Sequence, residues 1–131
     1  MFRARPMLRA AAGFMLAVVF FAGTEARARA TPDALPEITV AALPGEAREV
    51  LVVIRSGGPF RFDRDGVVFG NRERILPAQG RGYYHEYTVP TPGVKTRGAR
   101  RIVCGGPPRA PTVCFYSADH YQSFACITFV P

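Results

Sequence analysis

The sequence predicts an α+β domain in which one N-terminal amphipathic helix packs on an antiparallel β-sheet. Three observations lead to this prediction. Apolar residues repeat at helical spacing over residues 44–55. The segments that follow are short, rich in aromatic and β-branched residues, and bounded by glycine and proline. A helix followed by consecutive strands is the element order of an α+β domain with an antiparallel sheet.

The helix has start and stop signals at both ends. Pro44 suits a first helical turn, and Glu46 places a negative charge near the helix N-terminus, where it is favourable. Gly57 and Gly58 end the pattern. The apolar stripe must pack on strands, because the sequence after it predicts no second helix. Its members are Ala47, Val50, Leu51 and Ile54.

Five strands are expected after the helix, and residues 31–42 before it are expected to be extended. Gly82 and the Pro-Thr-Pro-Gly run at 90–93 bound the second strand. The five predicted strands are residues 67–69, 83–89, 99–104, 113–117 and 123–130.

Alternation along the strands predicts which side chains share a surface. Glu86 points to one face of its strand and His85 to the other, so these neighbours are not a direct pair. If the second and third strands pair, Arg101 shares the surface of Glu86. The turn between the last two strands would then hang His120 over that surface.

The first 30 residues have the pattern of a secretory signal peptide. Arginines precede an apolar run at 10–23, which is shorter than the roughly 20 apolar residues of a membrane span. Cleavage is expected after Ala28 or Ala30, with an uncleaved N-terminal anchor as the alternative. The sequence thus predicts a secreted domain over residues 31–131 that has no stable membrane association once the signal is removed.

The charge of the mature domain is modest and uneven. The chain of 131 residues has 17 Lys and Arg against 10 Asp and Glu, of which the first 30 residues hold five and one, so the remainder carries a net +3. Residues 95–101 contain four cations and no anion, which suits a phosphate-bearing partner. A solvated loop is the alternative for that run taken alone. A single domain, expected to be a monomer, follows from the length.

The three cysteines predict one disulfide and one free thiol in an oxidising compartment. Cys104 and Cys114 flank a stretch rich in glycine and proline between two predicted strands, so we prefer this pair and leave Cys126 free. No metal site or cofactor is predicted, because the chain has no CxxC and its histidines lie outside any ligand-like cluster.

Four side chains supply a minimal set for cleaving a phosphodiester. Glu86 can accept a proton, His120 can donate one, and Arg97 and Arg101 can hold the phosphate. RNA provides its own nucleophile, the 2′-hydroxyl group. Taken singly, each residue has a simpler interpretation, as a solvated glutamate, a turn histidine or arginines paired with carboxylates.

Four sequence blocks together resemble the bacterial guanyl-specific ribonucleases, the family of small secreted microbial ribonucleases that includes barnase. The resemblance covers about residues 40–128, with the motifs in the family's order. The blocks are residues 65–73, 82–89, 96–102 and 119–121.

The resemblance implies the microbial ribonuclease fold and a role for each matching residue. Glu86 would be the general base, His120 the general acid, and Arg97 and Arg101 the phosphate-binding pair, while Tyr121 would add a hydroxyl group to the phosphate site. The guanine-recognition loop would contain Phe69, Asn71, Arg72 and Glu73. The implied partners are single-stranded RNA and a dedicated barstar-like inhibitor protein, which is common for barnase-like enzymes.

Two positions depart from the family pattern. Gly70 stands where members often carry glutamine, which predicts a looser recognition loop. A related branch pairs an N-terminal cysteine with one near the C-terminus, and this chain has no cysteine near Thr39.

Guanine selection has a physical reason at Glu73. Guanine presents adjacent N1–H and N2–H donors, which one carboxylate can accept together, and Phe69 is placed to stack on a splayed base. The alternative for Glu73 is a surface ion pair with Arg72 or Arg74. For the whole chain, the competing function is a secreted cationic nucleic-acid-binding module without catalysis. A toxin-like ribonuclease would share the chemistry and differ in delivery.

Overall fold

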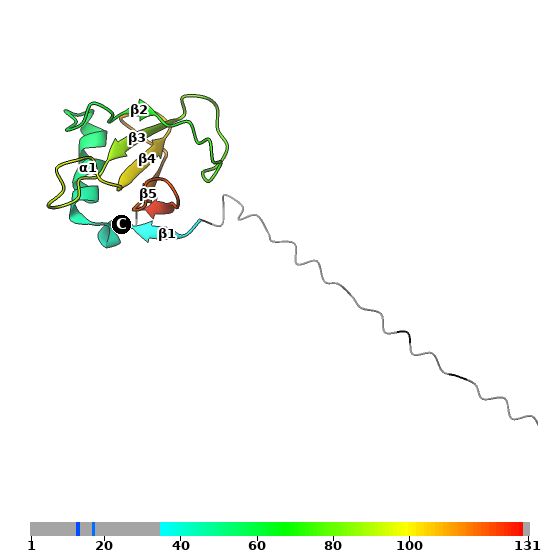
Figure 1. Cartoon of the computed structure of the whole chain (residues 1–131). Coiled ribbons are helices and arrows are strands. Elements are labelled where there is room, and N and C mark those ends of the chain that lie inside the picture. Colours follow the sequence, from blue (N-terminus) through cyan, green and yellow to red (C-terminus); the bar gives the residue numbers. More distant parts are fainter. Residues whose placement is uncertain (1–12, 14–16, 18–34, 130–131) are drawn as a thin grey trace, which may run out of the picture.

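The computed structural model describes residues 35–129 together with the isolated positions Gly13 and Ala17, so the predicted signal peptide lies essentially outside the described residues (Figure 1). The elements, in chain order, are β1 (Glu37–Thr39), the 3-10 helix η2 (Val40–Ala42), α1 (Gly45–Ser56), β2 (Val67–Val68), β3 (Tyr84–Thr88), β4 (Arg101–Gly105), β5 (Val113–Ser117) and β6 (Ala125–Thr128).

The predicted helix is confirmed to within one residue at each end. Pro44 is the N-cap of α1, and Glu46 lies in its first turn. Gly57 ends the helix in the left-handed region at φ 81°, and its N–H donates to the carbonyl of Ile54. This conformation is readily adopted by glycine and disfavoured for residues with a Cβ. No helix in the described part of the chain is long and apolar enough to cross a membrane.

The strands form one six-stranded sheet in the order β1-β6-β5-β4-β3-β2. All pairs are antiparallel except β1 with β6, which is parallel. The predicted α+β class is confirmed. The parallel pair was not predicted, because residues 31–42 were expected only to be extended. β1 leads into α1 and fills the open edge of β6, the last strand of the meander (Figure 1).

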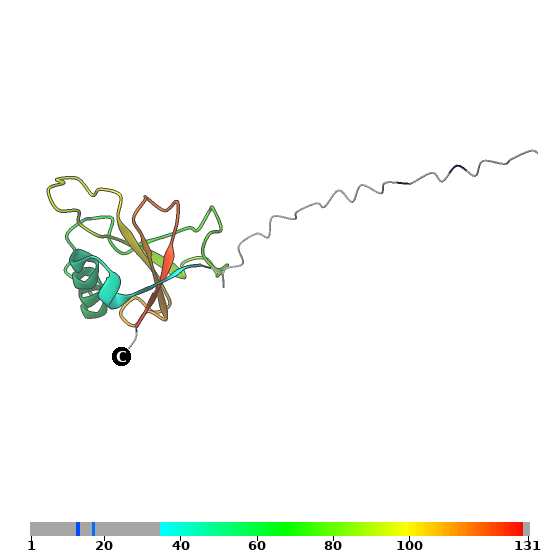
Figure 2. The same ribbon diagram turned by 90° about the horizontal axis from the view of Figure 1, so that it is seen from below.

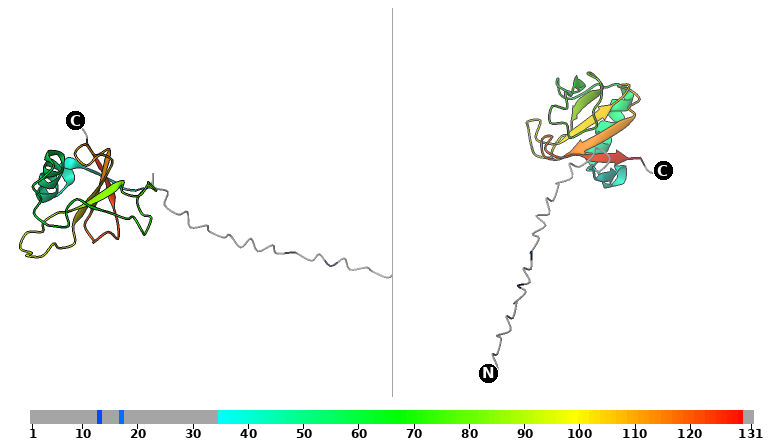
Figure 3. Two further views of the ribbon diagram at one scale, coloured as in Figure 1. Left: turned by 90° about the horizontal axis from the view of Figure 1, so that it is seen from above. Right: turned by 90° about the vertical axis from the view of Figure 1, so that its right-hand side faces the viewer.

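The helix and the site lie on opposite faces of the sheet. α1 covers one face (Figures 2 and 3). It buries Leu51 and Ile54 in a core cluster that includes Tyr87 and Ile102. A second, smaller core cluster lies on the other face, beneath the loop after β2 and the turn between β5 and β6. Its buried members are Leu76, Tyr84, Val103, Phe115 and Phe124.

The predicted disulfide between Cys104 and Cys114 is confirmed. The two residues are directly opposed in the β4–β5 register, with the sulfur atoms 2.06 Å apart, and both belong to the core on the helix face. Cys126 is a free, partly buried thiol. The bridge therefore holds the β4–β5 hairpin from the side away from the site.

Candidate active site

Glu86 and Arg101 share one surface of the sheet, as predicted from alternation. In the β3–β4 register Glu86 is opposite Val103, and Arg101 is opposite Thr88, so both point away from α1. Glu86 is only 6% exposed and Arg101 only 2%. Buried charges are costly unless they are paired and hydrogen-bonded, so their partners are informative.

Each carboxylate oxygen of Glu86 has a partner. Oε2 accepts a 2.7 Å hydrogen bond from the hydroxyl of Tyr121. Oε1 lies 3.5 Å from Nη2 of Arg97 and 3.8 Å from Nη2 of Arg64. The Tyr121 hydroxyl in turn accepts a 3.0 Å hydrogen bond from Nε of Arg101. One phenol thus connects the candidate base with a candidate phosphate-binding cation.

The guanidinium groups of Arg97 and Arg101 are held in place by their own hydrogen bonds. Nε of Arg97 donates to Oγ1 of Thr88 at 2.9 Å, and Nη1 of Arg101 donates to the carbonyls of Arg97 and Arg100 at 3.3 and 2.8 Å. Nη2 of Arg97 is buried and makes no hydrogen bond within residues 35–129. Its ion pair with Glu86 leaves this buried group without a hydrogen bond, which is unfavourable, and an incoming phosphate oxygen is the kind of acceptor that would satisfy it.

His120 is presented on a turn that is fixed by its neighbours. His120 and Tyr121 have φ values of 55° and 71°, in the left-handed region. The His120 N–H donates to the Ala99 carbonyl at 2.9 Å, and the Tyr121 N–H donates to Oγ of Ser117 at 3.0 Å. Non-glycine residues hold such backbone angles only where the surroundings enforce them. The turn leaves the His120 ring exposed, in a T-shaped arrangement with the ring of Tyr121.

Asp119 closes the same turn through its carboxylate. Oδ1 accepts hydrogen bonds from Oγ of Ser117 at 3.0 Å and from the N–H of Ser123 at 2.9 Å. The side-chain and backbone hydrogen bonds from Ser123 lower the pKa of Asp119 below its ordinary value. The ionised carboxylate therefore helps to hold His120 in place.

The pKa of Tyr121 is shifted in the opposite direction. Burial is the largest cause that raises the pKa of this phenol, and its hydrogen bond to Glu86 raises it further. Tyr121 is thus a protonated donor at neutral pH.

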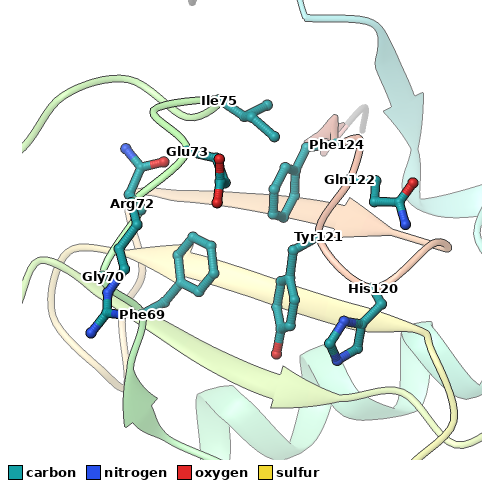
Figure 4. A pocket seen from close by; sticks show the side chains of 10 residues that line it. Phe69, Gly70, Arg72, Glu73, Ile75, His120, Tyr121, Gln122 and Phe124 are labelled. Atoms are coloured by element: carbon teal, nitrogen blue, oxygen red, sulfur yellow. The ribbon is translucent and has the colours of Figure 1, made fainter.

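A cleft of about 680 Å³ opens beside this network. The ring of Phe69 stacks on that of Tyr121 at 5.1 Å between centroids, and Phe124 meets Phe69 edge-on at 6.0 Å. These rings make an apolar platform with His120 at one end (Figure 4). The lining residues are Phe69, Gly70, Asn71, Arg72, Glu73, Ile75, His120, Tyr121, Gln122 and Phe124.

Glu73 is the free carboxylate of the cleft. Among the described residues it has no hydrogen bond or ion pair, so the predicted alternative of a pair with Arg72 or Arg74 is not observed. Figure 4 shows its side chain on the loop side of the cleft, between Arg72 and Phe124. The carboxylate is exposed and available to a ligand.

Asn71 shapes the loop through its side chain. Its amide nitrogen donates to the carbonyl of Leu76 at 2.9 Å, and its amide oxygen accepts from the N–H of Leu76 at 3.1 Å. With φ at 49°, Asn71 also lies in the left-handed region. Because the side chain is already used, any contact of Asn71 with a base would come from its backbone. The Arg72 side chain runs alongside Gly70 and is exposed.

Comparison with known proteins agrees with this arrangement. A family model described as ribonuclease matches residues 26–128. Guanyl-specific ribonuclease Sa of Kitasatospora aureofaciens is 50% identical over 95 residues, which are 72% of this chain and 96% of that protein. Guanyl-specific ribonuclease St of Saccharopolyspora erythraea is 49% identical over 88 residues, or 67% of this chain and 83% of that protein.

The chain belongs to the guanyl-specific ribonuclease family.

Solved structures of ribonuclease Sa2 resemble this ribonuclease over the described domain. The Sa2 complex with guanosine-2′-cyclophosphate has a TM-score of 0.68 and 45% identity, and covers 75% of this chain and all of Sa2. A second structure, from a study of Sa2 complexes with mononucleotides, has a TM-score of 0.68 and 46% identity. The match covers 72% of this chain and 95% of Sa2. The chain therefore shares both fold and family with ribonucleases that have been crystallised with guanine nucleotides.

Sequence reasoning missed several residues of this ribonuclease's site. Ile75, Gln122 and Phe124 line the cleft, and Arg64 approaches Glu86. The only signal for Arg64 was its position directly before the block at 65–73. A set of three or more potential metal ligands does not occur among the described residues.

Proposed function

We propose that this enzyme is a secreted endoribonuclease that cleaves single-stranded RNA on the 3′ side of guanosine without a metal ion. The observation that carries the proposal is the buried Glu86, tied to Arg97 and, through Tyr121, to Arg101, beside a cleft that also contains His120 and Glu73. The cleft and the network beside it thus bring together the groups for phosphodiester chemistry and a carboxylate for base recognition.

In the first step, Glu86 accepts the proton of the 2′-hydroxyl as this oxygen attacks phosphorus. His120, as imidazolium, donates a proton to the departing 5′-oxygen on the opposite side. The products are a 2′,3′-cyclic phosphate and a free 5′-hydroxyl. In the second step the roles reverse: His120 takes a proton from water as the water oxygen attacks phosphorus, and Glu86 returns a proton to the 2′-oxygen as the P–O2′ bond breaks. The product is a 3′-phosphate. A carboxylate that accepts a proton and an imidazolium that donates one form an acid–base pair that needs no metal ion.

Arg97 and Arg101 stabilise the charge that develops on the phosphoryl oxygens. Both are held before substrate arrives, so little reorganisation is needed during the reaction. Nη2 of Arg97 lies within ion-pair distance of Glu86 but makes no hydrogen bond within the described residues, so it suits a phosphate oxygen next to Glu86. The Tyr121 hydroxyl keeps Glu86 and Arg101 at a fixed separation.

Guanine is selected by Glu73 together with the aromatic platform. The free carboxylate accepts N1–H and N2–H of guanine while the base stacks in the cleft near Phe69. Adenine offers no such pair of donors. The guanine O6 atom accepts hydrogen bonds from backbone N–H groups of Gly70, Asn71 and Arg72.

Export is supported by the predicted signal sequence and by the disulfide between Cys104 and Cys114, which suits an oxidising compartment. An inhibitor protein that protects the producing cell stays an expectation from the family.

The experiment is digestion of a defined, unstructured RNA in the presence of a chelator, with mapping of the new ends. The expected result is cleavage after guanosine only, with 2′,3′-cyclic phosphate ends appearing first. A DNA strand of the same sequence should stay intact, because it lacks the 2′-hydroxyl nucleophile. Binding of the RNA without cleavage would instead support a nucleic-acid-binding module.

A further inference from the structure

Arg64 is an exposed cation on a well-anchored piece of backbone. The following residue, Asp65, accepts hydrogen bonds through Oδ1 from the Thr88 N–H at 2.7 Å and through Oδ2 from the Phe62 N–H at 3.2 Å. The Gly66 N–H donates to the carbonyl of Glu86 at 2.8 Å. The turn that carries Arg64 is thus fastened to β3, while the Arg64 side chain is 63% exposed.

Glu86 does not depend on Arg64 for compensation of its charge. Its Oε1 has the closer and less exposed Arg97, at 3.5 Å and 27% side-chain exposure, and its Oε2 has Tyr121. Arg64 is 3.8 Å away and makes no hydrogen bond to the carboxylate. Ion pairs made by an exposed side chain contribute little to stability. The position of Arg64 is therefore better explained by a ligand than by the fold.

We propose that Arg64 is a third substrate-binding cation, which contacts the scissile phosphate from the Oε1 side of Glu86. This inference rests on the proposed function. A base that takes the 2′ proton must lie next to the scissile phosphate, so a guanidinium group 3.8 Å from Oε1 is within a small side-chain rotation of that phosphate. Arg101 reaches the same region from the Tyr121 side. The phosphate would then be held between cations on both sides of the base.

The charge changes of the first step favour this role. Glu86 becomes neutral when it accepts the 2′ proton, while the phosphoryl oxygens become more negative. As the reaction proceeds, the negative charge near Arg64 therefore decreases on the carboxylate and increases on the phosphate. Because Arg64 makes no hydrogen bond to Glu86, its side chain can move toward the phosphate. Its attraction to the phosphoryl oxygens then increases in the transition state.

The test compares Arg64→Gln with Arg61→Gln, which removes the same charge from the same turn. Arg61 is exposed and packs over Phe62 without approaching Glu86. The measurements are kcat/KM for the dinucleotide GpC, and Kd for guanosine 3′-phosphate and for guanosine. Arg64→Gln should lower kcat/KM about tenfold and raise the Kd for guanosine 3′-phosphate about tenfold. An effect of about tenfold is at the low end of what a hydrogen bond to a charged group contributes. Its affinity for guanosine should stay unchanged, and Arg61→Gln should resemble the wild type throughout.

Other outcomes overturn the inference in distinguishable ways. Equal losses of kcat/KM and of affinity for guanosine 3′-phosphate in Arg64→Gln and Arg61→Gln would mean that Arg64 acts only through the overall charge of the protein. Equal weakening of guanosine and guanosine 3′-phosphate by Arg64→Gln would mean that the residue supports the cleft and does not bind phosphate. A wild-type enzyme that fails to cleave GpC would overturn the proposed function, and the two Kd values would still decide whether Arg64 binds phosphate.

Discussion

The hydroxyl group of Tyr121 donates a 2.7 Å hydrogen bond to Oε2 of Glu86. The hydroxyl oxygen of Tyr121 also accepts a hydrogen bond from Nε of Arg101, so a residue of the β5–β6 turn joins side chains from β3 and β4. The geometry of the candidate site therefore depends on that turn as well as on the sheet. The first prediction addresses this link.

Tyr121→Phe should lower the free energy of unfolding and the activity together. The ring still packs on Phe69, but Glu86 and Arg101 each lose a hydrogen bond. We expect a loss of about 1–3 kcal/mol in urea denaturation, the usual cost of leaving a buried polar group without a partner. Tyr83→Phe is the matched control, because the Tyr83 hydroxyl makes no hydrogen bond within the described residues. Equal stability of the two variants would contradict the structural importance of the link.

Glu73→Ala should remove guanine preference with little effect on the phosphorus chemistry. Loss of a charged acceptor for two donors should cost about 2–4 kcal/mol in kcat/KM for GpC, since such hydrogen bonds are worth ~1.5–3 each and are not additive. Cleavage of ApC should change little. Glu49→Ala, an exposed carboxylate on α1, is the control for net charge. An unchanged ratio of GpC to ApC would assign recognition to the loop backbone instead.

The shared surface of Glu86 and Arg101 was predictable because alternation along a strand is a local property. The two strands needed only to pair, and the Cys104–Cys114 bridge followed from the same pairing. The parallel partnership of β1 with β6 was not predictable, because it joins residues far apart in the chain through an open sheet edge.

The site shows the same division. His120 was expected over the surface, but the coupling of Tyr121 to Glu86 depends on a turn geometry that the residue types do not reveal. Asn71 was expected in the recognition loop, but the use of its side chain to close that loop onto Leu76 was not predicted. Arg64 was missed because its approach to Glu86 depends on how the turn before β2 docks on β3.

Asp119→Asn should destabilise the protein in a pH-dependent way. The pKa of Asp119 in the folded protein lies below its ordinary value of 3.8. Its ionised form therefore stabilises the fold at pH values above about 4, and this contribution is lost as the pH falls through the lowered pKa. Urea unfolding of both proteins from about pH 6 to pH 2 should show a difference that is constant at first and then shrinks. If the difference in the free energy of unfolding stayed the same at every pH, the ionisation of Asp119 would not contribute to the stability of the turn.

Replacing both Cys104 and Cys114 by alanine should reduce stability and leave the chemistry nearly intact. The bridge closes a loop with a sequence separation of 10 and lies in the core on the helix face. Loop-closure entropy predicts a loss of about 2–3 kcal/mol in the free energy of unfolding. The kcat/KM for GpC, measured where the variant is fully folded, should stay close to that of the wild type. A large loss of activity under those conditions would mean that the hairpin positions the site.

The assignment of Glu86 as base and His120 as acid is tested most directly by varying the leaving group. GpC needs a proton on its departing 5′-oxygen, whereas the p-nitrophenyl ester of guanosine 3′-phosphate releases a stable anion that needs none. Glu86→Gln should lower kcat for both substrates, by on the order of 10²-fold or more. His120→Ala should lower kcat by a similar factor for GpC and nearly spare the p-nitrophenyl ester. Equal losses on both substrates in His120→Ala would contradict its role as the general acid, and normal activity in Glu86→Gln would contradict the central claim.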